Sequence, residues 1–281
     1  MVKMGDVWDR GMEVLNGRGN MLAGIAAVTL FAPAVVAAAW SAYGAPTGPG
    51  AITMIITLLT TLAGLWGQLF VIAAASDPQT GRAAARRQAN ARFAPALLIV
   101  LVLGAVMLVA LLPTVVLLSA AGFDLAAMAQ GAKQAPTSPG LGLLAVLYAL
   151  IVFVVLLFVG GRMLPLYAVV LHERRGLAAV ARSWRLTRRH TWRLFGVVVL
   201  FLIVLMIATG AAQSVSGLIV RIALGAESRA TVTFLAAVVA QAVSTALTVI
   251  AIVFSAQLYV AFTARERLSR EPVALHEPEV A

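Results

Sequence analysis

The chain has 281 residues, of which 62% are hydrophobic and 11% are charged, and its mean hydropathy is +0.97. This composition excludes an ordinary soluble domain and predicts an all-α, polytopic membrane protein. The absence of cysteine excludes disulfide bonds, thiolate metal sites and cysteine nucleophiles.

The first 19 residues mix acidic and basic side chains. Asp6, Asp9 and Glu13 are mixed with Lys3 and Arg10, so the segment lacks the basic-then-apolar layout of a cleavable signal peptide, and we expect it to be retained. Its apolar residues gather near one side of a helical wheel. This pattern predicts a short helix over residues 1–19 that lies on the membrane interface.

Six stretches are long and apolar enough to cross a bilayer, for which about 20 residues suffice. The turn-forming residues 43–50 separate the first two stretches. The predicted spans form one transmembrane domain over residues 20–262, and they are 20–42, 51–75, 94–120, 141–171, 194–220 and 231–262.

The positive charges predict how these spans are oriented, because Lys and Arg beside a span resist translocation. With both termini cytoplasmic, the inner segments carry 17 of the 21 Lys and Arg, and the outer loops carry three. We therefore expect a multi-pass protein of the bacterial inner membrane with cytoplasmic termini and a disordered cytoplasmic tail over 263–281. The net charge of +10 then indicates contact with anionic lipid headgroups rather than with nucleic acid.

The strongest basic segment, HERRGLAAVARSWRLTRRHTWR, lies between the fourth and fifth spans. It predicts a cytoplasmic helix over 173–193 with two faces. One arc holds Leu177, Val180, Trp184, Thr187 and Thr191, and the other holds Arg182, Arg185, Arg189 and Arg193. Trp184 and Trp192 suit the depth of the membrane interface. Such a helix is either a plain connector or a surface that recognises lipid phosphate or a protein partner.

The fourth span contains the one intramembrane charge, Arg162, followed by Pro165. A straight helix over 141–171 would exceed the bilayer core of about 30 Å, so we expect a bend at Pro165. Arg162 then faces the bundle interior, with Gln68, Gln257 and freed carbonyls as partners. The alternative is that residues 163–171 run along the interface and Arg162 reaches out to it.

A faint repeat supports the same grouping. Gly67-Gln-Leu-Phe-Val71, Gly161-Arg-Met-Leu-Pro165 and Ala256-Gln-Leu-Tyr-Val260 recur at spacings of 94 and 95 residues. If these three segments are equivalent, the fold is a three-hairpin pseudo-repeat, and Gln68, Arg162 and Gln257 lie at one depth.

Catalytic motifs are not found. His172-Glu173 begins a zinc-protease motif, but Gly176 occupies the position of the second histidine. No carboxylate falls inside a predicted span, which removes the usual proton relays. We therefore expect no catalytic residue, metal or cofactor.

The residues from Arg162 and Pro165 through His172-Glu173 and Arg182-Ser-Trp-Arg-Leu-Thr187 to Trp192-Arg193-Leu194 resemble the six-helix membrane-domain family named after glycerophosphoryl diester phosphodiesterases. In that family an intramembrane Arg is followed by a Pro, a Glu and a basic helix that enters the fifth span. In its fused members a separate soluble domain performs hydrolysis. The resemblance therefore implies the membrane module without the catalytic phosphodiesterase domain.

These patterns favour a non-enzymatic membrane protein that interacts with lipid, or scaffolds a membrane-protein partner, at the cytoplasmic leaflet. A small transporter using the Gln68, Arg162 and Gln257 layer is the main alternative, and a membrane-embedded lipid enzyme is a third. The candidate lipid- or partner-binding residues are Arg162, Gln68, Gln257, Pro165, Glu173, Arg182, Arg185, Arg189, Arg193, Trp184 and Trp192.

Overall fold

The computed structural model describes residues 4–44, 50–124, 127–128, 134, 137–174, 176–188, 190–225 and 228–268. The regular elements among these residues are all helices. In chain order they are α1 (Met4–Ala26), η1 (Ala27–Phe31), α2 (Ala32–Ala39), η2 (Trp40–Gly44), α3 (Ala51–Ser76), α4 (Arg82–Ala120), α6 (Pro139–Met163), α7 (Leu166–Glu173), α8 (Ala178–Thr187), α9 (Thr191–Leu224) and α10 (Arg229–Leu268).

Within the described ranges, six helical stretches have the length and apolar composition needed to cross a membrane. They are Met4–Gly44, Ala51–Ser76, Arg82–Ala120, Pro139–Glu173, Thr191–Leu224 and Arg229–Leu268. The predicted all-α, polytopic membrane protein with six spans is thereby confirmed, and each predicted span falls inside one of these stretches.

The N-terminal segment differs from the separate interfacial helix that the sequence predicted. Helix α1 runs without a break from Met4 to Ala26 and is the first part of the first membrane helix. Part of its apolar side packs on protein, because Val7 is buried in a cluster with Leu194, Phe254 and Leu258, while Trp8 and Met12 stay exposed. A surface helix and the end of a packed span have the same one-sided apolar pattern, so the wheel alone does not separate them.

The first membrane helix widens into a π-helical turn at η1, directly before α2. Pro33 has no N–H to offer the carbonyl of Thr29, which disturbs the regular hydrogen-bond ladder here. The Thr29 hydroxyl donates to the Ile25 carbonyl at 2.8 Å. Thr29 is buried against Gly67 of α3, so η1 and α3 approach closely at this point.

The fourth membrane helix breaks where the sequence predicted a bend. Helix α6 ends at Met163 and α7 begins at Leu166, so Pro165 stands at the junction. The buried residues of α7 are Leu166, Ala168, Val169, Val170 and Leu171. This segment therefore lies in the core. The alternative interpretation, in which residues 163–171 run along the membrane interface, is wrong.

Buried side chains gather at one end of the molecule, which we call the basic end. It comprises the α3–α4 connector (77–81), helices α7 and α8 and the C-terminal turns of α10. The buried residues of α3 and α10 lie mostly in their C-terminal halves, and those of α4 lie in its first half. Toward the other end, the helices expose large apolar side chains, including Leu58, Leu108, Ile151 and Met206.

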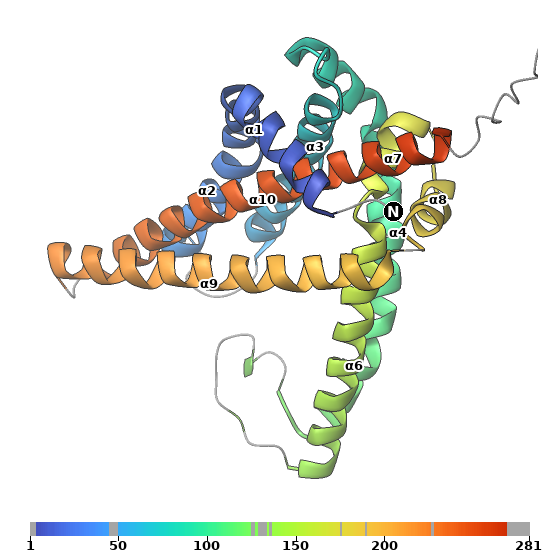
Figure 1. Ribbon diagram of the computed structural model, residues 1–281. Helices are drawn as coiled ribbons and strands as arrows, with labels where there is room; N and C mark the ends of the chain where they lie inside the picture. The colour runs from blue at the N-terminus through green and yellow to red at the C-terminus, as the bar shows by residue number, and fades with distance from the viewer. Residues whose placement is uncertain are drawn as a thin grey trace, which may run out of the picture.

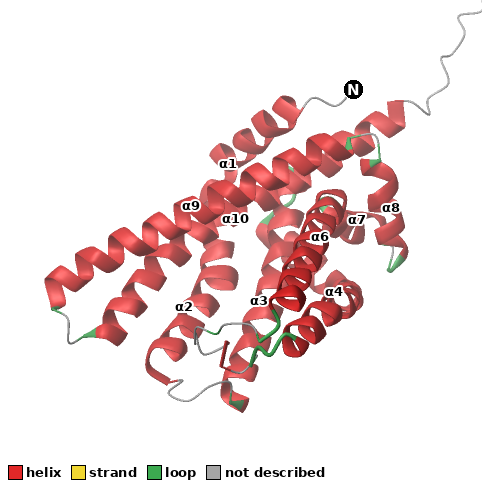
Figure 2. Ribbon diagram, turned by 90° about the horizontal axis from the view of Figure 1, so that it is seen from below, coloured by secondary structure: helices red, strands yellow, loops and turns green. Residues whose placement is uncertain are grey.

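The helix pairs separate away from the basic end. Figure 1 shows the pair α9 and α10 running in a different direction from the pair α4 and α6, and the view from below in Figure 2 agrees. Helices α6 and α9 come close where Gly161 faces the backbone of Leu194 and Phe195. The compact part of the fold therefore lies at the end that carries the candidate residues.

Candidate functional site

Helix α8 is shorter than the basic helix predicted over 173–193. Arg174 adopts a left-handed conformation with φ 54° and ends α7, and α8 spans only Ala178–Thr187. The face that α8 buries consists of Ala179, Ser183 and Thr187. This differs from the predicted arc, because Leu177 and Trp184, assigned to that arc, are both exposed.

The α6–α7 break explains why α8 buries its hydroxyl residues. The Arg162 carbonyl lies one turn before Pro165 and accepts hydrogen bonds from Ser183 Oγ at 2.9 Å and Thr187 Oγ1 at 3.3 Å. A helix end needs such donors because its last carbonyls have no partner within the helix. Ser183 and Thr187 therefore join α8 to the end of α6.

The Arg162 side chain lies against two aromatic rings. Its guanidinium carbon is 4.2 Å from the centre of the Trp184 ring and 5.2 Å from that of Phe158. Its buried Nε atom has no hydrogen-bond partner among the described residues. The expected hydrogen bonds to Gln68 and Gln257 are not formed, because Trp184 of α8 holds the guanidinium instead.

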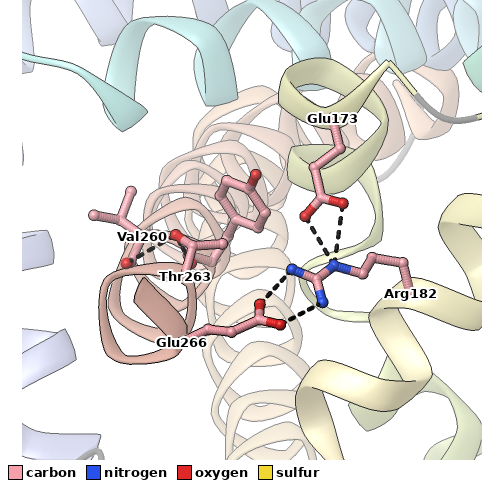
Figure 3. A network of polar contacts seen from close by, with 6 residues as sticks. Glu173, Arg182, Val260, Thr263 and Glu266 are labelled. Atoms are coloured by element: carbon pink, nitrogen blue, oxygen red, sulfur yellow. Dashed lines mark hydrogen bonds and ion pairs between the residues drawn. The ribbon is translucent and has the colours of Figure 1, made fainter. Parts of the chain in front are cut away.

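Arg182 stands between two carboxylates, as Figure 3 shows. Its Nε donates to the Glu173 carboxylate at 3.0 and 3.1 Å, and its two terminal nitrogens donate to Glu266, with Nη1 at 3.0 Å from Oε1. These hydrogen bonds, above all those to Glu266, raise the pKa of Arg182 above its ordinary value. Arg182 was a candidate lipid- or partner-binding residue on the basic arc, and in the structure it joins α7, α8 and α10 within the protein.

Helix α10 contributes two further contacts beside this network. The rings of Tyr259 and His172 are stacked, with their centroids 5.4 Å apart. The Thr263 hydroxyl donates to the Tyr259 carbonyl at 2.9 Å and to the Val260 carbonyl at 3.1 Å. Residues 263–268, expected in a disordered tail, thus continue α10 and place Glu266 against α8, while residues 269–281 lie outside the described part of the chain.

The end of α3 is held by one predicted residue and one that sequence reasoning missed. Gln257 Nε2 donates to the Ala75 carbonyl at 2.7 Å. Arg18 of α1 donates to the carbonyls of Ala74 at 2.6 Å, Pro78 at 2.5 Å and Thr80 at 3.0 Å. Both side chains satisfy carbonyls that a helix end leaves open. The signal that could have found Arg18 is a cation near the C-terminus of a neighbouring helix.

The connector after α3 has its own polar turn. The Asp77 carboxylate accepts hydrogen bonds from the backbone N–H of Gln79 at 2.8 Å and from Thr80 Oγ1 at 3.0 Å. The backbone hydrogen bond from Gln79, followed by that from Thr80, lowers the pKa of Asp77 below its ordinary value.

The remaining candidates are not brought together. Gln68 is partly buried on α3, while Arg185 and Arg193 are exposed on α8 and α9. Trp192 is 79% exposed and meets Phe158 and Phe195 edge-on, with ring centroids 6.3 and 6.0 Å away. Arg189 lies outside the described residues.

The chemistry available here is that of positive charge and hydrogen-bond donation. In the described part of the chain, no group of three or more His, Asp or Glu side chains is placed to hold a metal ion. Arg162 and Arg193 are cations near α8 beside two tryptophans that are partly or largely exposed. Such a surface suits anions at a membrane interface.

Comparison with known proteins gives a family without an assigned role. No curated protein and no solved structure matches the chain. The model of a domain of unknown function, DUF7847, matches residues 5–265, and the chain therefore belongs to that family.

Proposed function

We propose that this membrane protein is a non-enzymatic module that binds anionic lipid headgroups at the cytoplasmic leaflet of a bacterial membrane. The observation that carries the proposal is the setting of Arg162. Its guanidinium is held by Trp184 and Phe158, and among the described residues neither a carboxylate nor a hydrogen-bond acceptor pairs with that side chain.

An arginine within a spanning helix needs a compensating interaction. Its insertion costs about 3 kcal/mol at the helix centre, and the cost falls where the side chain reaches the interface. The two rings supply a cation–π contact but no negative charge. A lipid phosphate at this depth supplies the charge and accepts the guanidinium hydrogen bonds. The excess of Lys and Arg in the segments at the basic end supports placing that end in the cytoplasmic leaflet.

The transporter alternative depended on a polar layer of Gln68, Arg162 and Gln257. Gln257 donates instead to the Ala75 carbonyl at the end of α3, and Arg162 stacks on Trp184. No observation among the described residues favours the transporter. The resemblance to the phosphodiesterase-associated membrane modules stays a prediction, and it agrees with a role that needs no catalytic residues in this chain.

The test compares Arg162→Leu with Arg185→Leu in the full chain. Each variant is purified in detergent with phosphatidylglycerol, and the lipid retained is measured by native mass spectrometry. Native mass spectra resolve the number of lipids bound, and Arg162→Leu should lower the affinity for one of them about tenfold or more, since one charge-assisted contact is lost. Arg185→Leu removes the same charge from an exposed position on α8 and should change retention by less than about threefold.

Membrane insertion and thermal unfolding are measured for both variants, so that a folding defect is recognised. Arg162→Lys provides a second comparison: it keeps the charge but loses the planar group that stacks and binds phosphate with two donors, and intermediate retention is expected. Equal retention by the wild-type chain and a folded Arg162→Leu variant would overturn the proposal.

A further inference from the structure

A groove of about 510 Å³ lies between the first membrane helix, α3 and the start of α4. Its apolar part is lined by Ile25, Val28, Trp66 and Phe70, and its basic part is lined by Arg82 and Arg86. This volume is within the usual range for small-molecule sites, about 300–1,000 Å³. The groove shares no lining residue with the Arg162 site, so it is a separate feature of the basic end.

The basic side of the groove is built along one face of α4. Arg82, Arg86 and Asn90 are spaced four residues apart, which places them above one another on a helix. Asn90 Oδ1 accepts a hydrogen bond from Trp66 Nε1 at 2.6 Å. The Trp66 ring in turn packs on Phe70, with ring centroids 5.5 Å apart. The face that carries the arginines therefore also fixes the aromatic wall.

The charge of the groove is unbalanced. No carboxylate lines it, and the first turn of α4 has no acidic residue. Arg82 and Arg86 are exposed, and within the described ranges neither forms an ion pair or donates a side-chain hydrogen bond. The dipole of α4 adds partial positive charge at the same end. The groove therefore suits a ligand with an anionic group at one end.

The other end of the groove is apolar and faces the membrane. Val28 is 65% exposed and belongs to a helix that crosses the bilayer, whereas Phe70 is buried on the opposite wall. A soluble anion would leave this apolar wall uncovered, at a cost in exposed hydrophobic surface. An acyl chain covers it and can enter sideways from the surrounding lipid.

We infer that this groove binds one anionic phospholipid, with its phosphate between Arg82 and Arg86 and an acyl chain against Trp66 and Phe70. The inference rests on the proposed lipid-binding function but uses different residues. It extends that function from a charged surface to a site that recognises headgroup and chain together.

The experiment uses the full chain in phosphatidylcholine vesicles that contain phosphatidylglycerol with a photoactivatable diazirine in one acyl chain. After irradiation, labelled peptides are mapped by mass spectrometry. Label is expected on residues 25–29 and 66–70. The variant Arg82→Gln/Arg86→Gln should reduce labelling of these residues about 10- to 30-fold, because two phosphate contacts are lost.

The matched control is Arg87→Gln/Arg92→Gln, which removes the same charge from the same helix outside the groove lining. Labelling of the groove should stay within about threefold of the wild type, the change expected from weaker general attraction to the surface. Ala83 lines the groove and is exposed, so Ala83→Trp serves as a second test that fills the groove without changing its charge. It should also abolish labelling, and circular dichroism checks that each variant is folded.

Three outcomes would overturn the inference. One is an equal loss of groove labelling in Arg82→Gln/Arg86→Gln and in Arg87→Gln/Arg92→Gln, because this would mean that the lipid is attracted to the basic surface in general. Another is unchanged labelling in the folded Ala83→Trp variant. The third is displacement of the labelled lipid by millimolar inorganic phosphate, which means that the acyl chain contributes nothing. The two sites are tested separately. Arg162→Leu should lower lipid retention and leave groove labelling intact, and Arg82→Gln/Arg86→Gln should lower groove labelling and leave the lipid at Arg162 in place.

Discussion

At the residue scale, Gly67 marks a close approach between α3 and the π-helical turn η1. A Cβ atom added at this position would lie 2.6 Å from the Thr29 Cβ atom, closer than real side chains come. Thr29 is buried and β-branched, so it cannot turn away easily. We predict that Gly67→Ala lowers the free energy of unfolding by about 1–3 kcal/mol, measured by thermal unfolding in detergent.

Gly64 is the matched control, since it lies on the same helix one turn earlier and the nearest atom to an added Cβ is 4.0 Å away. Gly64→Ala should leave stability unchanged or raise it slightly. The double variant Gly67→Ala/Thr29→Gly removes the Cβ atom of Thr29 that the new methyl group would meet, so it should be more stable than the sum of the two single changes predicts. A Gly67→Ala chain as stable as the wild type would contradict the close packing of η1 on α3.

Single residues also mark the limit of what the sequence could predict. The sequence predicted equal membrane depth for Gln257 and Arg162, because each lies second in one of the short segments that recur every 94 or 95 residues. In the structure, Gln257 donates a hydrogen bond to the Ala75 carbonyl, and the Arg162 guanidinium stacks on the Trp184 ring. Depth along a helix follows from sequence, but the direction of a side chain depends on the neighbouring helix. For Arg162 that neighbour is α8, whose position the sequence did not fix.

At the scale of elements, Arg182 is the joint between α7, α8 and α10. Its side chain is 16% exposed, and those of Glu173 and Glu266 are 17% and 27% exposed. Arg182→Met would leave two partly buried carboxylates facing each other without a cation. We predict a loss of about 1–3 kcal/mol in the free energy of unfolding, less than for a fully buried network because solvent screens part of the interaction.

Arg185→Met removes the same charge from an exposed position of α8 and should change stability by less than about 0.5 kcal/mol. Arg182→Met/Glu266→Gln removes one of the two opposed charges and should recover part of the loss. If Arg182→Met and Arg185→Met unfold at the same temperature, the joint does not stabilise the fold.

The pH dependence of this joint has a defined sign. The folded pKa of Arg182 lies above its ordinary value, so its contribution is complete below that ordinary value and is lost only as pH rises through the raised pKa. We expect the stability difference between the wild type and Arg182→Met to stay constant between roughly pH 7 and pH 10. A difference that shrinks over this range, measured by thermal unfolding, would contradict the assignment.

Elements were predicted unevenly for a physical reason. Apolar length identified six membrane helices, and Pro165 identified the break between α6 and α7. The extent of α8 was wrong because Arg174 leaves the helical conformation, and nothing in its residue type requires this. Glu266 was missed because its partner Arg182 is 84 residues away in sequence, and the pairing depends on the crossing of α8 and α10.

At the scale of the whole molecule, the two ends of the described chain lie together. Val7 packs in one cluster with Phe262, and Glu266 pairs with Arg182 at the basic end. The helix pair α4 and α6 joins at the opposite end. The two ends of the described part of the chain therefore lie on the same side of the membrane.

We predict that this side is the cytoplasm, because 17 of the 21 Lys and Arg lie in segments on that side. Reporter fusions after Ala281 should be active in the cytoplasm, and fusions near Pro136 should be active only outside it. The opposite result at either position would contradict the orientation, and with it the leaflet assigned to both lipid sites.

The close approach of Gly161 to the backbone of Leu194 and Phe195 has a mechanical consequence. Helices α6 and α9 touch there, while residues farther along, such as Ile151 and Met206, are exposed to the membrane. The far end of α10 is held as well, because the Tyr43 hydroxyl of η2 donates to Thr231 at 3.2 Å and the Tyr43 ring packs on Phe234 with the centroids 5.7 Å apart. The α4–α6 pair lacks such a contact to η2 in the described part of the chain. A spanning helix tilts to match bilayer thickness, so we expect the tilt of this pair to follow that thickness and to change the position of α8, which packs on the end of α6.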